Sequence, residues 1–162
     1  MLKLNLGCNQ WKLSGFENID IDPKFKPDRI VDLLNLQDYY EPNSVDFIYA
    51  GHILEHFDIE NSNRIARVCF EILKPCSSLM TVVPDYSKTM NLSVEMAEKV
   101  ILADGEHKAI FNENRMYRVM KQAGFRTVTE ITKLNEVPFI IVPNINNPVP
   151  EPWQTAHLSL KI

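Results

Sequence analysis

The chain has 162 residues, of which 45% are hydrophobic and 23% charged, and its formal net charge is −4 at pH 7. These values are ordinary for a globular protein and argue against disorder, and the length fits a single domain spanning residues 1–162. The sequence has no run of Lys or Arg of the kind that contacts a phosphate backbone, so nucleic acid is not an expected partner.

The chain begins with alternating residues, Leu2, Leu4 and Leu6, which lead directly into Gly7 and predict a strand that ends in a turn. The same segment lacks the charged and long apolar regions of a signal peptide, and no stretch has the length of a membrane span. We therefore expect a cytoplasmic protein without a membrane partner. Three further strands are expected before the first helix, at 18–22, 29–34 and 45–50, each next to turn-forming residues.

The second half of the chain alternates helical and extended patterns. One apolar helical face predicts a helix over 59–73, which Pro75 should stop, and an apolar run predicts a central strand at 79–83. A weaker helical pattern over 93–103 precedes a stronger one that Asn112 caps and Gly124 ends. Strands are expected at 126–132 and 156–162, and the prolines between 138 and 152 exclude a continuous helix or strand there.

This order of elements predicts an α/β fold, a mostly parallel sheet with helices on both faces that binds ligands at the carboxyl ends of its strands. The turn at Gly7 is the first candidate, because glycine permits positive φ and close approach of a ligand to the backbone. Asn9 also tolerates the left-handed conformation, so the chain can turn sharply at both positions. The alternative is that Gly7 only ends the strand. A GxGxxG dinucleotide motif is absent.

Acidic residues follow the next two strands. A carboxylate at Asp20 is suited to accept both hydroxyls of a ribose, although strand-end acids are often only solvated. Asp22 is a competing candidate on the same face. Asp32 is suited to receive an adenine amino group while Leu33 and Leu34 cover the ring.

The stretch GHILEHF after the fourth strand is rich in titratable groups. His52 and His56 are four residues apart, so on a helix they would share a face with the spacing of a metal pair. No third ligand accompanies them at a recognisable spacing, and we predict no metal site. The alternatives are a structural or capping role and the lining of a substrate pocket. Asp85 and His107 are further candidates at the same edge of the sheet, with solvated loops as the alternative. The cysteines, Cys8, Cys69 and Cys76, follow neither a disulfide framework nor a CxxC motif and are expected to be reduced thiols.

In order, the segments LNLGCN, GFENIDIDP, DRIVDLLNL, SVDFIYAGHILEHF, EILKP, LMTVVPD, EHKAIFNE and QAGF resemble class I S-adenosylmethionine (SAM)-dependent methyltransferases. The likeness is to a short subgroup in which LNLGCG leads almost directly to G(F/W)xNIDxxP, and it extends from Leu2 to about Phe125 and loosely to the last strand. It implies a Rossmann-like sheet in the order 3-2-1-4-5-7-6 with the last strand antiparallel.

The resemblance also implies roles for individual residues. The turn at Gly7 would approach the methionine part of SAM, the segment at Asp20 the ribose, Asp32 the adenine, and the segment at Ala50 the sulfonium. The complete set of implied cofactor-binding residues is Gly7, Cys8, Asn9, Asp20, Ile21, Asp32, Leu33, Ala50, Gly51 and His52.

Three departures from the family pattern stand out. Asn9 replaces the second Gly of GCG, Cys76 and Ser77 replace a Gly pair after LKP, and the segment between Gly7 and Asp20 is too short for a full first helix. The last of these matches the subgroup.

These observations lead to the hypothesis of a SAM-dependent methyltransferase acting on a small-molecule or sugar-like acceptor. A hydroxyl acceptor would need a general base, and the candidates are His52, His56, Asp85 and His107. Two other interpretations stay open. One is a catalytically inactive methyltransferase-like domain that serves in binding or assembly, and the other is a nicotinamide-dependent oxidoreductase. The oligomeric state is not predicted.

Overall fold

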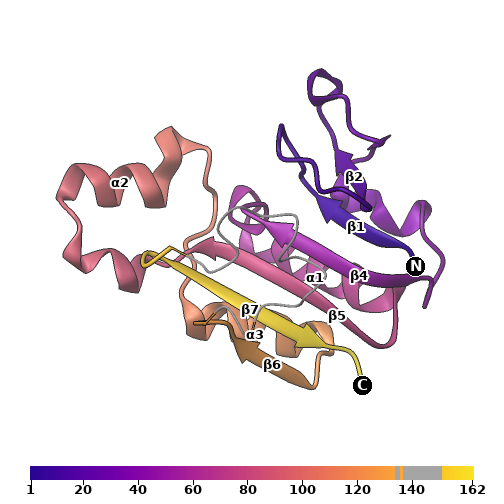
Figure 1. The fold of residues 1–162 in the computed structure, drawn as a ribbon. Coiled ribbons are helices and arrows are strands. Elements are labelled where there is room, and N and C mark those ends of the chain that lie inside the picture. The colour runs from indigo at the N-terminus through magenta and orange to yellow at the C-terminus, as the bar shows by residue number, and fades with distance from the viewer. Residues whose placement is uncertain (134–135, 137–150) are drawn as a thin grey trace.

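The computed structural model describes residues 1–133, 136 and 151–162, and its centre is a seven-stranded sheet in the order β3-β2-β1-β4-β5-β7-β6 (Figure 1). The strands from β3 to β5 run parallel, and β7 is antiparallel to both of its neighbours, β5 and β6. The sheet order and the antiparallel last strand predicted from the sequence are confirmed. The strands are β1 (Lys3–Leu6), β2 (Glu17–Asp20), β3 (Arg29–Ile30), β4 (Val45–Gly51), β5 (Leu73–Pro84), β6 (Thr127–Glu130) and β7 (Gln154–Leu160).

The α-helices connect strands of the second half of the chain, and short 3-10 helices occur in both halves. The α-helices are α1 (Ile59–Ile72), α2 (Val94–Leu102) and α3 (Glu113–Ala123), and the short 3-10 helices are η1 (Pro23–Phe25), η2 (Leu33–Asp38), η3 (Leu54–His56), η4 (Tyr86–Asn91) and η5 (Ala103–Gly105). Asn112 caps α3 by accepting a hydrogen bond from the Arg115 N–H, and Gly124 ends this helix in the left-handed conformation, as predicted. None of the helices in the described part of the chain is long and apolar enough to cross a membrane.

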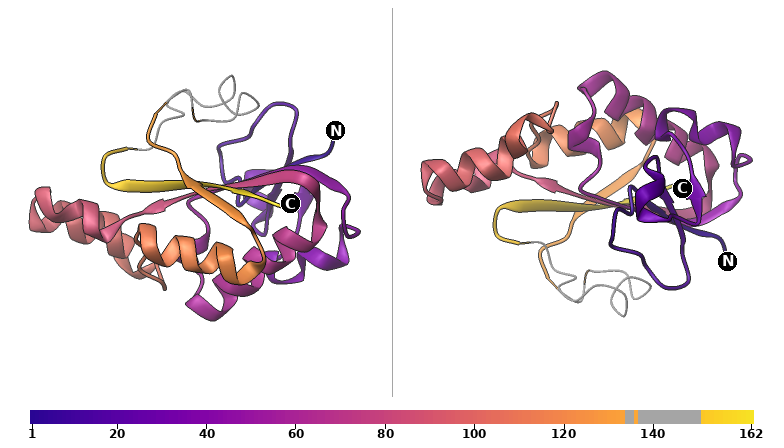
Figure 2. Two further views of the ribbon diagram at one scale, coloured as in Figure 1. Left: turned by 90° about the horizontal axis from the view of Figure 1, so that it is seen from below. Right: turned by 90° about the horizontal axis from the view of Figure 1, so that it is seen from above.

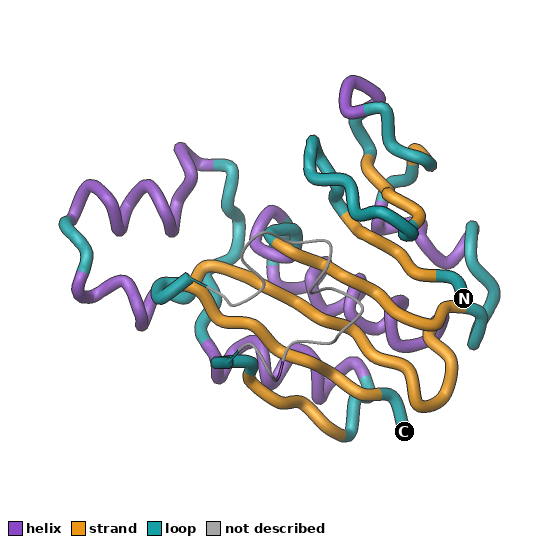
Figure 3. Tube along the Cα trace, in the orientation of Figure 1, coloured by secondary structure: helices purple, strands orange, loops and turns teal. Residues whose placement is uncertain are grey.

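The two faces of the sheet are covered differently. Helices α1 and α3 lie together on one face (Figure 2), where Leu4, Leu6 and Ile48 are fully buried in the main hydrophobic core. On the opposite face a smaller cluster gathers around Phe16 and Phe47, whose rings meet edge to face at 6.1 Å. The cover there includes the loop of residues 7–16, drawn teal in Figure 3, which takes the place of a first helix.

Two strands, β3 and β5, differ most in length from the sequence expectation. The strand predicted at 29–34 ends at Ile30, because the Asp32 carboxylate accepts a hydrogen bond from the Leu34 N–H and begins η2 instead. The strand predicted at 79–83 extends back to Leu73, directly after α1. Pro75 therefore lies within β5, at a break in the register with β4, which is a position where strands tolerate proline.

Two other segments need separate mention. Helix α2 has no buried residue and extends away from the sheet, with η4 and η5 as its principal contacts (Figure 1). Most of the proline-rich stretch at 138–152 lies outside the described residues.

Candidate functional site

A cleft of about 1070 Å³ lies at the carboxyl ends of β1, β2 and β4. This volume lies just above the usual range of about 300 to 1000 Å³ for small-molecule sites. Most of the residues singled out in the sequence line it, whereas Ala50, Asp85 and His107 do not. The sequence-predicted residues that line the cleft are Gly7, Cys8, Asn9, Asp20, Ile21, Asp32, Leu33, Gly51, His52 and His56.

The turn after β1 adopts the predicted left-handed conformation at both positions, with φ of 63° at Gly7 and 47° at Asn9. A Cβ on Gly7 would lie only 2.4 Å from Cδ1 of Ile53, so the glycine also lets this turn pack against the segment after β4. Cys8 is buried, and its burial, together with the nearby Asp20 charge, raises the pKa of its thiol. The Cys8 side chain is therefore a neutral thiol at neutral pH.

Asp20 connects the two loops at this end of the sheet. Its Oδ2 accepts a hydrogen bond from the Asn9 N–H at 2.8 Å, and its Oδ1 accepts one from the Asp22 N–H at 2.9 Å. Each carboxylate oxygen has two lone pairs, so one on each remains for a ligand. Asp22, the competing candidate, instead forms an ion pair with Lys24 at 2.7 Å and does not line the cleft.

Apolar residues form the neighbouring wall. Ile21 is 62% exposed, although it follows a buried strand, and Leu33 is buried at the start of η2. Both line the cleft together with Asp32, whose Oδ1 caps η2. A flat apolar group bound here would therefore contact the Ile21 and Leu33 side chains, and the Asp32 carboxylate would lie at its edge.

Tyr49 lines the cleft beside Gly51, and it was not selected from the sequence. Its side chain lies against the Gly51 backbone, since a Cβ on Gly51 would be 2.4 Å from the Tyr49 hydroxyl oxygen. Burial and the charge of Glu55 raise the pKa of Tyr49 to about 12, so its hydroxyl stays protonated at neutral pH. The alternation of faces along β4 could have identified Tyr49 from the sequence. It places Tyr49 on the face of the sheet opposite the buried Ile48 and Ala50.

His52 has a left-handed backbone, with φ of 54°, and both nitrogens of its ring have polar neighbours. Nδ1 lies 3.1 Å from Oε1 of Glu55, and Nε2 lies 2.9 Å from the amide nitrogen of Gln154. Because an amide nitrogen can only donate, Nε2 is the acceptor and Nδ1 carries the hydrogen that is donated to Glu55. His52 and His56 do not share a helical face, since only the short η3 forms between them.

His56 lies next to a residue from a distant part of the chain. Its ring meets that of His107 edge to face, with 4.9 Å between the centroids. Nδ1 of His107 is 2.9 Å from the Ile101 carbonyl oxygen. The backbone joins the two segments, because the Glu55 carbonyl oxygen accepts hydrogen bonds from the Lys108 and Ala109 N–H groups. The structure therefore brings His107 to His56, although only His56 lines the cleft.

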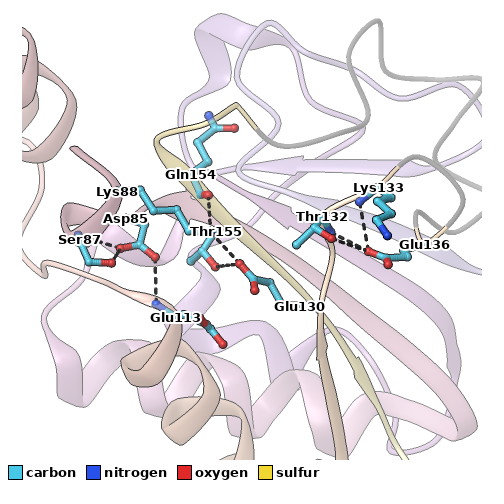
Figure 4. Close-up of polar contacts among 10 residues, drawn as sticks. All are labelled: Asp85, Ser87, Lys88, Glu113, Glu130, Thr132, Lys133, Glu136, Gln154 and Thr155. Atoms are coloured by element: carbon cyan, nitrogen blue, oxygen red, sulfur yellow. Dashed lines mark hydrogen bonds and ion pairs between the residues drawn. The ribbon is translucent and has the colours of Figure 1, made fainter. Parts of the chain in front are cut away.

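Asp85, a predicted candidate base, is fully buried and lies outside the cleft. Its Oδ1 accepts hydrogen bonds from the backbone and hydroxyl of Ser87, and its Oδ2 accepts one from the Glu113 N–H (Figure 4). These bonds begin η4 and hold the first turn of α3. The carboxylate therefore has a structural role, and we exclude Asp85 from the catalytic candidates.

A second polar group in Figure 4 connects η4 to the strands at the far edge of the sheet. Lys88 forms an ion pair with Glu130 at 2.6 Å and donates a hydrogen bond to the Gln154 carbonyl oxygen. Nearby, Oε2 of Glu136 accepts hydrogen bonds from the Thr132 and Lys133 N–H groups. These contacts hold the β6–β7 side of the sheet together, and through Gln154 they reach the wall of the cleft.

Comparison with known proteins connects this architecture to one fold. No model of a protein family matches the sequence, and a search of curated proteins finds no match. Among solved structures, a SAM-dependent methyltransferase from Archaeoglobus fulgidus has a TM-score of 0.70 and 16% identity, over 98% of this chain and 85% of that one. A Thermotoga maritima SAM-dependent methyltransferase, described as a possible histamine N-methyltransferase, has a TM-score of 0.73 and 14% identity, over 99% of this chain and 82% of that one.

A third similar structure contains the cofactor. Phosphoethanolamine N-methyltransferase 2 from Haemonchus contortus, in complex with SAM, has a TM-score of 0.65 and 12% identity over 99% of this chain. This chain spans about half of that protein, with 48% of it covered. At such identities the likeness establishes the fold, which is that of class I SAM-dependent methyltransferases.

Proposed function

We propose that this protein is a SAM-dependent methyltransferase whose single domain, residues 1–162, binds SAM in the cleft and methylates a small-molecule or sugar-like acceptor. The observation that carries the proposal is the pairing of the Asp20 carboxylate with the Asn9 backbone, at the mouth of a large cleft over the carboxyl ends of β1 and β2. In open α/β sheets this is where nucleoside ligands bind.

The residues of the cleft fit such a ligand chemically. The free lone pairs of Asp20 suit the two ribose hydroxyls, and the Asp32 carboxylate beside Ile21 and Leu33 suits the amino edge and faces of adenine. The turn at Gly7, Cys8 and Asn9 would hold the methionine part. Gly51 and His52 would lie near the sulfonium. Ala50 would contribute through its backbone only, because its side chain is buried in the main core.

SAM, when bound, supplies a methyl group made electrophilic by the sulfonium. The contribution of the chain is to align the acceptor and exclude water, and this orientation is worth up to about 7 to 11 kcal/mol of the barrier. For a hydroxyl acceptor, a base adds a further factor of roughly 10² to 10⁴. Of the predicted bases that line the cleft, His56 has no hydrogen bond on its ring within the described residues. The Nε2 lone pair of His52 accepts a hydrogen bond from the Gln154 amide, so His52 would act as a base only after Gln154 is displaced.

The test is calorimetric titration of the full chain with SAM and with S-adenosylhomocysteine. We expect both to bind, and Asp20→Ala to weaken S-adenosylhomocysteine by about 10- to 100-fold, because hydrogen bonds to a charged group contribute about 1.5 to 3 kcal/mol. Asp22→Ala is the matched control, since this acid follows the same strand but lies outside the cleft, and it should bind like the wild type.

The proposal fails if neither ligand binds the folded wild-type protein at millimolar concentration, or if Asp20→Ala binds like the wild type. Binding without methyl transfer to any acceptor would indicate the inactive binding or assembly domain. Affinity for NAD(H) in place of SAM would indicate the oxidoreductase.

A further inference from the structure

We propose that Glu55, His56 and His107 form a binding site for one divalent transition-metal ion such as Zn²⁺. One potential ligand atom from each of the three residues lies within 4.8 Å of the other two. The site was not visible in the sequence, because His107 is distant from the other two residues along the chain and joins them only through the fold.

The Glu55 side chain gives the first independent indication of a ligand. It is 1% exposed, and its Oε1 lies 3.1 Å from Nδ1 of His52. Its Oε2 is buried and has no hydrogen-bond partner in the described part of the chain. A buried carboxylate oxygen without a partner is costly, and such groups in native proteins call for an explanation such as a bound ion. A cation between Glu55 and the two imidazoles would satisfy Oε2.

The imidazoles are prepared for coordination. Nδ1 of His107 lies 2.9 Å from the Ile101 carbonyl oxygen and must donate to it, which leaves the lone pair of Nε2 free. Histidines that bind metals usually donate their other ring N–H to a carbonyl or carboxylate in this way. No hydrogen bond engages the His56 ring within residues 1–133, 136 and 151–162, so either of its nitrogens is available as a ligand.

The backbone holds the two segments together. Both Lys108 and Ala109 donate to the Glu55 carbonyl oxygen, at 2.8 and 3.1 Å, so His107 is anchored next to η3. Zinc ligands lie about 2.0 to 2.1 Å from the metal, which places two ligand atoms of a tetrahedral site about 3.4 Å apart. The ligand atoms therefore have to approach one another by up to about 1.4 Å, which small rotations of the side chains can supply.

The donor set determines the class of metal. Imidazole suits Zn²⁺ and related first-row ions, whereas Mg²⁺ and Ca²⁺ prefer sites made of oxygen ligands. Three protein ligands leave at least one coordination position open. His56 lines the cleft, so the metal would lie at the cleft wall. If the proposed methyltransferase function holds, that position would bind an acceptor oxygen.

The test measures metal binding and requires neither SAM nor an acceptor, so it can succeed or fail independently of the proposed function. Full-length protein that has been freed of metal with a chelator is titrated with Zn²⁺ by calorimetry, and with Co²⁺ by visible absorption. We expect one ion per chain and the intense d–d bands of four- or five-coordinate Co²⁺, with no competition from Mg²⁺. All titrations use a Cys76→Ser background, since Cys76 is an exposed thiol that also binds soft metals.

His56→Ala and His107→Ala should each weaken Zn²⁺ binding by more than the roughly 10- to 100-fold that loss of an outer-shell partner costs. Glu55→Gln should do the same while conserving the size of the buried side chain, in case an alanine variant fails to fold. Asp104→Asn is the matched control, because it removes an exposed carboxylate near His107 that lies outside both the cluster and the cleft. Asparagine tolerates the left-handed backbone of this position, and the Zn²⁺ affinity of the variant should not change. The proposal is wrong if no stoichiometric binding occurs, or if circular dichroism shows folded variants that bind Zn²⁺ as tightly as the parent.

Discussion

Asp20 and Asp85 show how two acids in equivalent positions acquire different roles. Asp20 ends β2 and Asp85 directly follows β5, so the sequence pattern predicts a ligand-facing acid at both positions. Asp20 accepts two backbone N–H groups and faces the cleft, whereas Asp85 accepts three hydrogen bonds and is completely buried. Position at a strand end is therefore not sufficient to identify a ligand-binding acid. The deciding properties are the lone pairs that remain and the space in front of them.

The largest expected effect comes from Asp85→Ala. This change removes a buried carboxylate that accepts three hydrogen bonds, and at roughly 1 to 1.5 kcal/mol for each bond we expect a loss of about 4 kcal/mol in the free energy of unfolding. Urea denaturation measures the loss. Affinity for S-adenosylhomocysteine, measured on the fraction that is folded, should be unchanged.

Asp20→Ala should give the reverse pattern, with a large change in affinity and a smaller change in stability. Ser87→Ala is the control for Asp85, because it removes only the hydroxyl contact and should cost about 1 kcal/mol. Loss of ligand affinity in folded Asp85→Ala would contradict the comparison.

His157 should produce a pH dependence of stability that is separate from the cleft. It is 2% exposed on β7, and burial lowers its pKa to about 4, with Lys88 also lowering it while Glu130 and Asp85 raise it. Between pH 6.5 and 4 the unfolded chain binds the proton more readily, so the free energy of unfolding should fall as the pH falls through this range. The loss is about 3 kcal/mol, from about 1.4 kcal/mol per pKa unit.

Urea denaturation at pH 7 and at pH 4 checks this prediction, with His157→Gln as the comparison. The variant should lose less stability on acidification, by nearly the same 3 kcal/mol. Parallel pH profiles for the two proteins would show that another group is responsible.

The smallest expected effect concerns Asn9, where the related sequence pattern has glycine. The φ of 47° suits asparagine and glycine, but in alanine the left-handed conformation would destabilise the folded state by about 1 kcal/mol. We expect Asn9→Ala to lose that much in a denaturation experiment. Asn9→Gly should be within about 0.5 kcal/mol of the wild type and should bind S-adenosylhomocysteine within about threefold. A tenfold gain for the glycine variant would mean that the Asn9 side chain obstructs the cleft.

The sequence predicted the features that depend on local patterns. The apolar runs and breaks gave the order of strands and helices, and the family resemblance gave the arrangement of the strands in the sheet. The left-handed turn at Gly7 and Asn9 followed from residue type alone, and the structure confirms it. The meeting of Asp20 with this turn followed from the parallel neighbours β1 and β2, whose carboxyl ends share one edge of the sheet.

The features that the sequence analysis missed depend on competition between side chains and backbone for hydrogen-bond partners, and on contacts between residues far apart in the chain. Asp32 shortens β3, because its side chain offers the Leu34 N–H a better partner than a strand does. The structural role of Asp85 depends on the Glu113 N–H, which belongs to a helix elsewhere in the chain and donates a hydrogen bond to the Asp85 carboxylate. His56 and His107 are neighbours because the Glu55 carbonyl holds the second segment, and this contact leaves no periodic trace in the sequence.

The loop that replaces a first helix has an electrostatic consequence. A helix that starts after β1 would direct the positive end of its macrodipole, about half an elementary charge, toward the cleft, and this attracts phosphates. No helix forms in residues 7–16, all of which are described, and several amides of this loop already donate to acceptors within the protein. The turn after β1 therefore lacks the helix-terminus amides that bind the diphosphate of a dinucleotide, and it presents no opposing helix dipole to a cationic ligand.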